Sequence, residues 1–215
     1  MNEILQGDCL DLMGKLPSES IDFVFCDYPF NCQDGRKEYV PFVEATAREF
    51  KRLLKTNCVL LVVNNPANIV KTLHAFKEFH HRDTIILTRK GSIRPAYRFG
   101  FQHNQLLTFV NGEDIKYKWN GTKVNHDKTF LTDVIPYQNG YRGKGKDWHP
   151  QAMPYELVAR FVEIFSDEND VVLDPFMGSD TTALACVELG RRFIGMEYNQ
   201  KYVDMANKRI GLFSC

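Results

Sequence analysis

No apolar stretch of this 215-residue sequence approaches the roughly 18 residues that a membrane-spanning helix requires. Residues 1–3 also lack the basic start and the long apolar run of a secretory signal peptide. With 14 glycines and 9 prolines, the chain has none of the bias that marks collagen-like and low-complexity proteins. Because 44% of the residues are apolar and 25% are charged, we expect one globular domain that is neither secreted nor membrane-spanning.

Cysteine and histidine spacing typical of a metal site is missing as well. The six cysteines include no C-x2-C pair, and most of them lie inside apolar runs, as buried reduced thiols do. The histidines have no ligand spacing with cysteine or acidic residues, so surface or stacking roles fit them better. We therefore expect a cytoplasmic protein without a metal.

The chain has no net charge, but its charges are unevenly distributed. Overall there are 27 basic and 27 acidic side chains, whereas residues 81–150 contain twelve basic and six acidic ones. Lysine and arginine near phosphates gain free energy by counterion release, so this region is a candidate for binding a polyanion. A solvated surface on which charges happen to cluster would have the same composition, and charge alone does not separate the two.

Short apolar runs alternate with segments of helical periodicity. Such alternation predicts a three-layer, doubly wound α/β fold, with a mostly parallel sheet covered by helices on both faces. Strands are expected at residues 21–27, 58–63, 84–88, 105–110, 171–174 and 192–197. Helices are expected at residues 10–15, 39–55, 66–79, 155–165, 181–189 and 201–210.

This rhythm breaks down between residues 90 and 148. Apart from the strand at 105–110, the segment is rich in glycine, asparagine, lysine and aromatic residues. A stretch of this length inside a compact domain is usually functional. We interpret residues 90–148 as a recognition insertion within a single domain of residues 1–215.

A glycine-containing turn follows the strand at residues 171–174 and leads into an apolar helix. In doubly wound sheets, ligands bind at the carboxyl ends of strands, where backbone N–H groups of such a turn approach them closely. The next strand ends in Glu197, where an acid can accept hydrogen bonds from the two hydroxyls of a ribose. The arrangement favours a nucleoside ligand, although a strand–glycine–helix turn alone is weak evidence.

The sequence DPFMGSDTT at residues 174–182 resembles the D-P-F-x-G-S-G-T-T signature of S-adenosylmethionine-dependent DNA amino-methyltransferases. As in that family, a His149-Pro150 pair precedes it and a strand ending Gly195-Met196-Glu197 follows it. The resemblance implies a Rossmann-like methyltransferase fold in a prokaryotic or phage-infected cell, with S-adenosylmethionine as cofactor and not a dinucleotide. The cofactor-binding residues that it implies are Asp8, Cys9, Asp27, His149, Asp174, Pro175, Phe176, Gly178, Ser179, Asp180, Thr181, Thr182, Glu197 and Tyr198.

The tetrapeptide Asp27-Tyr28-Pro29-Phe30 resembles the D-P-P-Y motif of the same family and ends a predicted strand. The lone pair of an exocyclic amine is delocalised into the ring. A carboxylate and a backbone carbonyl that accept its two protons can localise that pair for attack on a methyl group. The resemblance implies these roles for Asp27 and for the carbonyl of Tyr28 or Pro29, with Phe30 stacking on a base swung out of the duplex.

The block that runs from Gln6-Gly7-Asp8 to Ile21-Asp22 is similar to the family's G-D-x-x-x-x-L-x-x-L-P-x-x-S-I-D block, whose acid contacts the cofactor adenine. Asp8 can equally cap a helix, and both roles can hold. The catalytic block precedes the cofactor turn, which is the order of the beta subclass, whose middle insertion selects the target sequence. Expected DNA contacts are Arg89, Lys90, Arg94, Arg98, Lys144 and Lys146.

Several positions depart from the family pattern. Tyr28 replaces the first proline of D-P-P-Y, which loosens the backbone, and residues 149–154 lack the usual lysine. Asp180 replaces the last glycine of G-S-G and adds a carboxylate near that of the cofactor. We expect weaker cofactor binding unless Asp180 turns away to cap the next helix. These departures leave open a slow or inactive enzyme.

The resulting prediction is a methyltransferase that acts on adenine N6 in double-stranded DNA, and many relatives work as homodimers. N4-cytosine methylation is the nearest alternative, since its chemistry is the same, and a non-catalytic DNA-binding relative is the other. A C5-cytosine enzyme needs a cysteine nucleophile, normally after a proline, and none of the 9 prolines precedes a cysteine.

Overall fold

The structure, a computed structural model, describes residues 2–29, 39–93, 100–113, 132–136, 153–178 and 180–211, with residues 89–93 as backbone only. In these ranges one sheet has the strand order β1-β8-β7-β2-β3-β5-β4-β6. Its strands are β1 (Asn2–Gln6), β2 (Ile21–Asp27), β3 (Leu54–Asn64), β4 (His80–Ile93), β5 (Phe101–Val110), β6 (Val134–Pro136), β7 (Val171–Asp174) and β8 (Arg192–Glu197). The helices are α1 (Cys9–Met13), α2 (Tyr39–Leu53), α3 (Ile69–Ala75), α4 (Tyr155–Phe165), α5 (Thr181–Glu188) and α6 (Gln200–Gly211).

The sheet is mostly parallel, which confirms the predicted class. Every neighbouring pair of the described strands is parallel except the two pairs that involve β5, which runs antiparallel to β3 and to β4. The chain moves from β2 through α2 to β3 on one side, and from β7 through α5 to β8 on the other. Because parallel crossovers share one hand, these two directions place α2 and α5 on opposite faces of the sheet.

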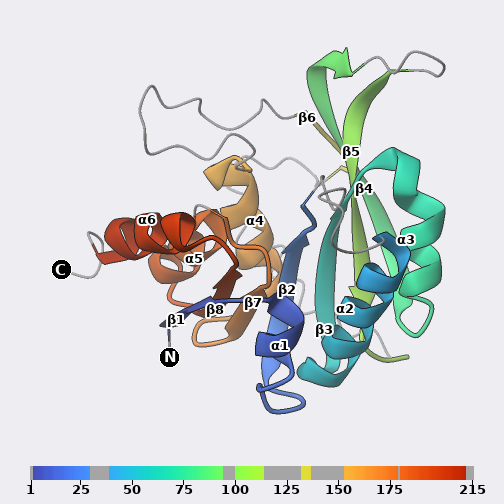
Figure 1. Cartoon of the computed structure of the whole chain (residues 1–215). Coiled ribbons are helices and arrows are strands. Elements are labelled where there is room, and N and C mark those ends of the chain that lie inside the picture. The colour runs from blue at the N-terminus through green and yellow to red at the C-terminus, as the bar shows by residue number, and fades with distance from the viewer. Residues whose placement is uncertain are drawn as a thin grey trace.

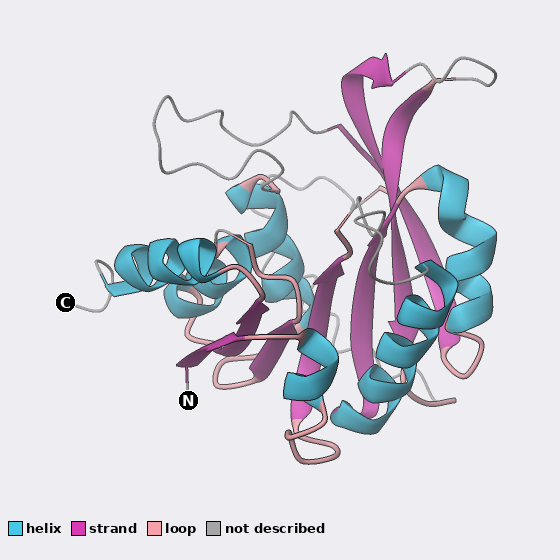
Figure 2. Cartoon of the chain, viewed as in Figure 1, coloured by secondary structure: helices cyan, strands magenta, loops and turns pink. Residues whose placement is uncertain are grey.

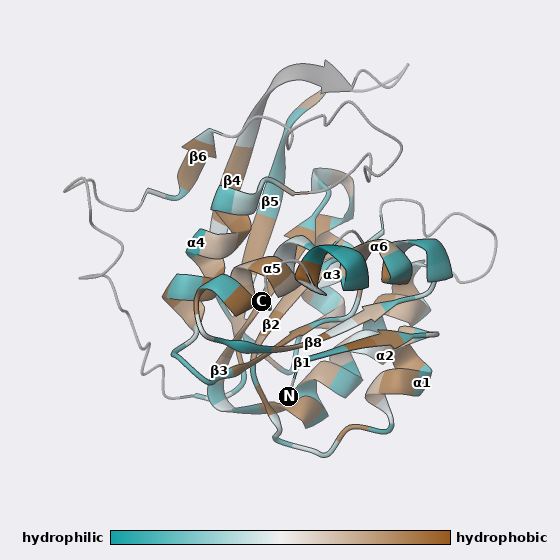
Figure 3. Ribbon diagram, turned by 90° about the vertical axis from the view of Figure 1, so that its left-hand side faces the viewer, coloured by the Kyte–Doolittle hydropathy of each residue, from teal (hydrophilic) through white to brown (hydrophobic). Residues whose placement is uncertain are grey.

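Two hydrophobic layers result, with α1 to α3 on one face and α4 to α6 on the other (Figure 1). Side chains alternate along β2, so Val24 and Cys26 pack toward the first group of helices and Phe23 and Phe25 toward the second. A strand buried on both faces reads as a continuous apolar run. In Figure 3 the central strands are accordingly hydrophobic, whereas α3 and α6 carry hydrophilic stretches.

Most predicted elements are confirmed, and the predicted strands at 171–174 and 192–197 match residue for residue. The helix expected at 66–79 was wrong in extent: a 3-10 turn (Pro66–Asn68) precedes α3, which ends at Ala75. The strand expected at 84–88 extends over His80–Ile93. β1 and β6 were not predicted, because each is short and exists only through pairing with β8 and β4 respectively.

β4 and β5 are long, and their far ends extend beyond the helical layers (Figure 2). β5 and β6 lie within residues 90–148 and belong to the sheet, while much of the remainder of that segment lies outside the described residues. Among the described helices, none is both long enough and apolar enough to cross a membrane.

Candidate functional site

The adjacent strands β2 and β7 form the switch point of the sheet. They pair in parallel, with Phe23 opposite Val172 and Val24 opposite Leu173. Beyond them the chain leaves toward opposite faces, and ligands of such folds bind at the carboxyl ends of the strands at this point. The last residues of these two strands are Asp27 and Asp174, so the sequence motifs that contain them converge.

Asp27 has a buried carboxylate oxygen with an unused hydrogen-bonding capacity. Its Oδ1 atom has no hydrogen-bond partner within the described residues. Burial, together with the nearby Asp174 carboxylate, raises the pKa of Asp27 to about 8. A buried acceptor without a donor is costly unless a ligand supplies the donor, so this oxygen fits a site for an N–H group.

Asp174 is buried too, but its carboxylate has partners. The Phe176 N–H donates to Asp174 Oδ1 at 3.0 Å, and the Thr182 side chain also bonds the carboxylate. Burial raises the pKa of Asp174, and the hydrogen bonds oppose that rise, so that the resulting pKa is about 6. Since two neighbouring carboxylates resist ionising together, and since the Asp174 carboxylate has hydrogen-bond donors, the pKa of Asp27 is raised further than that of Asp174.

Glu197 and the turn after β7 hold each other. The Gly178 N–H donates to Glu197 Oε2 at 3.1 Å, and the Asn199 N–H donates to Oε1 at 2.7 Å. Gly178 has a φ of 56°, a left-handed conformation that glycine adopts without strain. Each carboxylate oxygen keeps a further lone pair, so Glu197 can still accept hydrogen bonds from a ribose.

The segment after β1 reaches the same end of the sheet. Gln6 lies opposite Glu197 in the ladder, and the Gly7 N–H donates to the Glu197 carbonyl at 3.0 Å. Asp8 caps α1 by accepting a hydrogen bond from the Leu10 N–H at 2.9 Å, which confirms the capping role. Its predicted contact with a cofactor adenine stays a prediction.

The buried carboxylates, the glycine turn and Glu197 fit a nucleoside-type cofactor at this end of the sheet. Comparison with known proteins identifies the family of the chain, because residues 21–208 match the family described as DNA methylase.

The chain belongs to the DNA methylase family.

Two curated relatives resemble this DNA methylase over most of its length. The type II methyltransferase M.HinfI of Haemophilus influenzae is 28% identical over 98% of this chain and 68% of its own. The DNA adenine methyltransferase YhdJ of Escherichia coli is 28% identical over 98% of this chain and 83% of its own.

Solved structures share the fold. M1.HpyAVI in complex with SAM has a TM-score of 0.75 and 24% identity, over 98% of this chain and 99% of its own. TTHA0409 of Thermus thermophilus, in complex with S-adenosylmethionine, has a TM-score of 0.77 and 21% identity, over 99% and 94%. The cytosine-N4-specific PvuII methyltransferase has a TM-score of 0.82 and 21% identity, over 97% and 86%.

In this methylase the Tyr28 side chain points into the core. It is 5% exposed, its hydroxyl is hydrogen-bonded to the Thr46 hydroxyl, and its ring centroid lies 5.3 Å from that of Phe176. Thr46 uses its own proton on the Val43 carbonyl, so the Tyr28 hydroxyl is the donor. What Tyr28 can offer a substrate is therefore its backbone carbonyl, in keeping with the predicted role.

The turn after β7 packs against residues of α2 and β8. Phe176 lies 5.9 Å from Phe42 between ring centroids, and the Met177 N–H donates to the Met196 carbonyl at 2.9 Å. Gly195 lies against Met177, and a Cβ atom at position 195 would collide with the Met177 sulfur. The sequence argument missed this contact, although the glycine before Met196-Glu197 was a signal for it.

Asp180 pairs with a cation and does not cap the next helix. It has the left-handed conformation (φ 83°), but its side chain does not cap α5. Instead Asp180 Oδ1 lies 2.7 Å from Nη1 of Arg209 on α6. Burial raises the pKa of Asp180 to about 7, and Arg209 opposes that rise. Arg209 was not predicted, although an acid in a glycine position calls for a cation nearby.

The other predicted residues differ in their environment. Cys9 is buried in the core, while Tyr198 is 63% exposed beside the site. Pro175 and Thr182 are buried, and Thr181 is half-buried at the start of α5. Phe30, Arg94, Arg98, Lys144, Lys146, His149 and Ser179 lie outside the described residues, as do the side chains of Arg89 and Lys90 on β4. The described part of the chain holds no cluster of side chains suited to a metal ion.

Proposed function

We propose that this DNA methylase transfers a methyl group from S-adenosylmethionine to the N6 amine of adenine in double-stranded DNA. The observation that carries the proposal is the buried Asp27 oxygen at the switch point, which has no partner in the described ranges and lies beside the turn that Glu197 holds. Both curated relatives named above are methyltransferases, and the name of YhdJ specifies DNA adenine.

The residues of the site divide into two groups. Asp174, Gly178 and Glu197 would hold the cofactor, which when bound supplies an electrophilic methyl group on a sulfonium. Asp27 and the carbonyl of Tyr28 or Pro29 would accept the two amine protons, and Phe30 would stack on the extruded base. Once the nitrogen has gained a fourth bond it must lose a proton, and a carboxyl with its pKa raised to about 8 can hold it.

Cytosine N4 is the second candidate, because its exocyclic amine offers the same hydrogen-bonding pattern to Asp27. The high TM-score to the N4-specific PvuII enzyme is consistent with it, but a similarity at 21% identity reports the fold and not the base. A DNA-binding protein without activity is the third.

The test is incubation with labelled S-adenosylmethionine and unmethylated duplex DNA, followed by nucleoside analysis. We expect labelled N6-methyladenine from the wild type and none from Asp27→Asn, which keeps the shape of the side chain. Calorimetric titration with the cofactor should show that Asp27→Asn still binds it. Label in N4-methylcytosine would reassign the base, and DNA binding without label would favour the inactive relative.

Three further properties accompany the proposal. Residues 90–148 would select the target sequence, with Arg89, Lys90, Arg94, Arg98, Lys144 and Lys146 at the DNA. We also propose a homodimer, which light scattering of the purified protein would test. An enzyme of this kind would work in the cytoplasm of a prokaryotic or phage-infected cell, where the DNA is.

A further inference from the structure

Asp180 occupies a position that suits glycine. Its φ of 83° and ψ of 11° lie in the left-handed region, which strains residues that carry a Cβ atom. The side chain is also completely buried. A residue that meets both conditions is expected to supply something that glycine cannot, namely a side-chain contact.

That contact is the ion pair with Arg209. Asp180 Oδ1 and Arg209 Nη1 are 2.7 Å apart, and the Arg209 side chain remains 43% exposed. Neither Asp180 oxygen accepts a hydrogen bond from the described residues, so the attraction is mainly between the charges. A buried carboxylate that loses its paired cation is strongly unfavourable, which makes Asp180 dependent on Arg209.

The backbone of Asp180 closes the cofactor turn. Its N–H donates to the Met177 carbonyl at 3.1 Å, and its carbonyl accepts from the Leu184 N–H at 2.9 Å. Gly178, whose N–H meets Glu197, lies between the two ends of this turn. Whatever orients the Asp180 side chain therefore also orients the turn.

We propose that Arg209 is a positioning residue for the turn after β7: by pairing with Asp180 it keeps Met177, Gly178 and Asp180 in the arrangement that brings the Gly178 N–H to Glu197. Helix α6 thereby takes part in cofactor binding without touching the cofactor. The inference rests on the proposed function, since it assumes that S-adenosylmethionine binds at this turn.

A double-mutant cycle tests it, with the dissociation constant of S-adenosylmethionine measured by calorimetry and the unfolding temperature measured alongside. Arg209→Met should weaken binding about tenfold, and Arg209→Lys, which keeps the charge, should recover part of the loss. In the Asp180→Gly background, where no buried charge remains at this position, Arg209→Met should change the constant by less than about twofold. Lys208→Ala, one residue away and exposed, is the matched control and should bind as the wild type does.

Two results would overturn the inference. Arg209→Met with unchanged affinity and a lower unfolding temperature would mean that the ion pair only joins α6 to the fold. If Arg209→Met lost as much affinity in the Asp180→Gly background as in the wild type, Arg209 would act directly and not through Asp180. If Arg209→Met does not fold, Arg209→Lys takes its place in both backgrounds. A loss of affinity in the wild-type background and none in the Asp180→Gly background supports the inference, and unchanged affinity in both overturns it. Wild-type protein that binds no cofactor would instead overturn the proposed function, and the inference with it.

Discussion

At the scale of single residues, the two acids at the switch point have different surroundings. Asp174 is satisfied by the Phe176 N–H and by Thr182, whereas Asp27 keeps a buried oxygen without a partner among the described residues. The difference raises the pKa of Asp27 further than that of Asp174. Such an unsatisfied group costs stability and is retained where a ligand uses it.

Asp27→Asn should therefore stabilise the protein in a pH-dependent way. The pKa of Asp27 is about 8 in the folded state and about 3.9 in an unfolded chain, so its stabilising contribution is present below pH 4 and is lost as the pH rises toward 8. Asparagine cannot ionise and escapes that loss. We expect a variant that is more stable than the wild type by up to about 5 kcal/mol at pH 8 and similar near pH 4, measured by urea unfolding.

The matched control is Asp22→Asn on the same strand. Asp22 pairs with Lys55 at 2.6 Å and accepts the Val171 N–H at 2.9 Å, so this variant should not gain stability at pH 8. A gain from Asp27→Asn that is equal at both pH values would show that ionisation is not its cause.

Substitutions of Tyr28 should separate effects on stability from effects on cofactor binding, because the ring packs in the core and the hydroxyl makes one hydrogen bond. Tyr28→Phe removes the hydrogen bond to Thr46 and should cost about 1 kcal/mol of unfolding free energy, with most activity retained. Tyr28→Ala removes the ring beside Phe42 and Phe176 and should cost about 3–5 kcal/mol, with weakened cofactor binding. Urea unfolding and cofactor titration measure both; an inactive but stable Tyr28→Phe would show that the hydroxyl takes part in the reaction, and not the backbone carbonyl alone.

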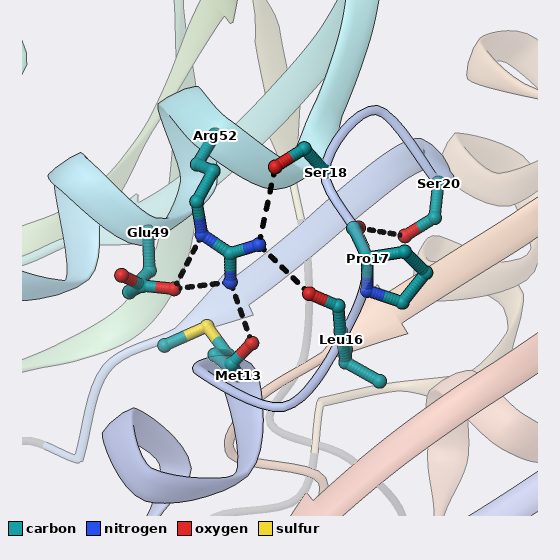
Figure 4. A network of polar contacts seen from close by, with 7 residues as sticks. All are labelled: Met13, Leu16, Pro17, Ser18, Ser20, Glu49 and Arg52. Carbon is teal, nitrogen blue, oxygen red and sulfur yellow. Dashed lines mark hydrogen bonds and ion pairs between the residues drawn. The ribbon is translucent and has the colours of Figure 1, made fainter.

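At the scale of elements, Arg52 of α2 holds the segment that leads from α1 to β2 (Figure 4). Its guanidinium donates to the Met13 and Leu16 carbonyls, each at 2.7 Å, and pairs with Glu49 at 2.6 Å. The last carbonyls of a helix lack partners within it, and α1 has no basic residue in its own last turn. Arg52 thus fixes α1, the helix that Asp8 caps.

Arg52→Ala should lower the unfolding free energy by about 1–3 kcal/mol, since it leaves partly buried carbonyls without donors. Urea unfolding measures the change. Arg48→Ala, an exposed position one turn earlier on α2, should stay within about 0.5 kcal/mol of the wild type. Equal effects of the two substitutions would indicate loss of a general charge and not of this network.

At the scale of the whole molecule, the uneven charge and the shape of the sheet agree. The region with twelve basic and six acidic side chains includes β5 and most of β4, and the far ends of these strands project beyond the helical layers (Figure 2). The carboxyl end of β4 belongs to this basic region and lies at the same end of the sheet as Asp27, which suits the proposed DNA contact.

DNA binding should therefore weaken as salt increases, with a slope of about −0.9 for each phosphate neutralised. The double variant Arg94→Ala/Arg98→Ala should reduce the slope by up to about 2. Lys71→Ala/Lys77→Ala removes the same charge from the exposed surface around α3 and should leave the slope unchanged. Fluorescence anisotropy across a salt series measures both; equal slopes for the two double variants would remove the DNA contact from residues 94 and 98.

The parallel α/β class and the ends of the buried strands β2 and β7 followed from local pattern. Strands that are buried on two faces must be apolar throughout, and the helices between them show apolar residues at helical spacing. Asp27, Asp174 and Glu197 each end such a strand, but the roles predicted for Asp27 and Asp174 depended on the resemblance to DNA amino-methyltransferases. β1 escaped notice because an edge strand with exposed ends has little pattern of its own.

The sequence by itself determined which residue types could do the chemistry and which strands carry them. Only the tertiary structure decided that Asp180 pairs with Arg209, that Tyr28 packs on Phe176, and that the described residues leave one buried Asp27 oxygen unpaired. These features depend on segments far apart in the chain. No local pattern encodes them, since each depends on the direction in which a side chain leaves its own element.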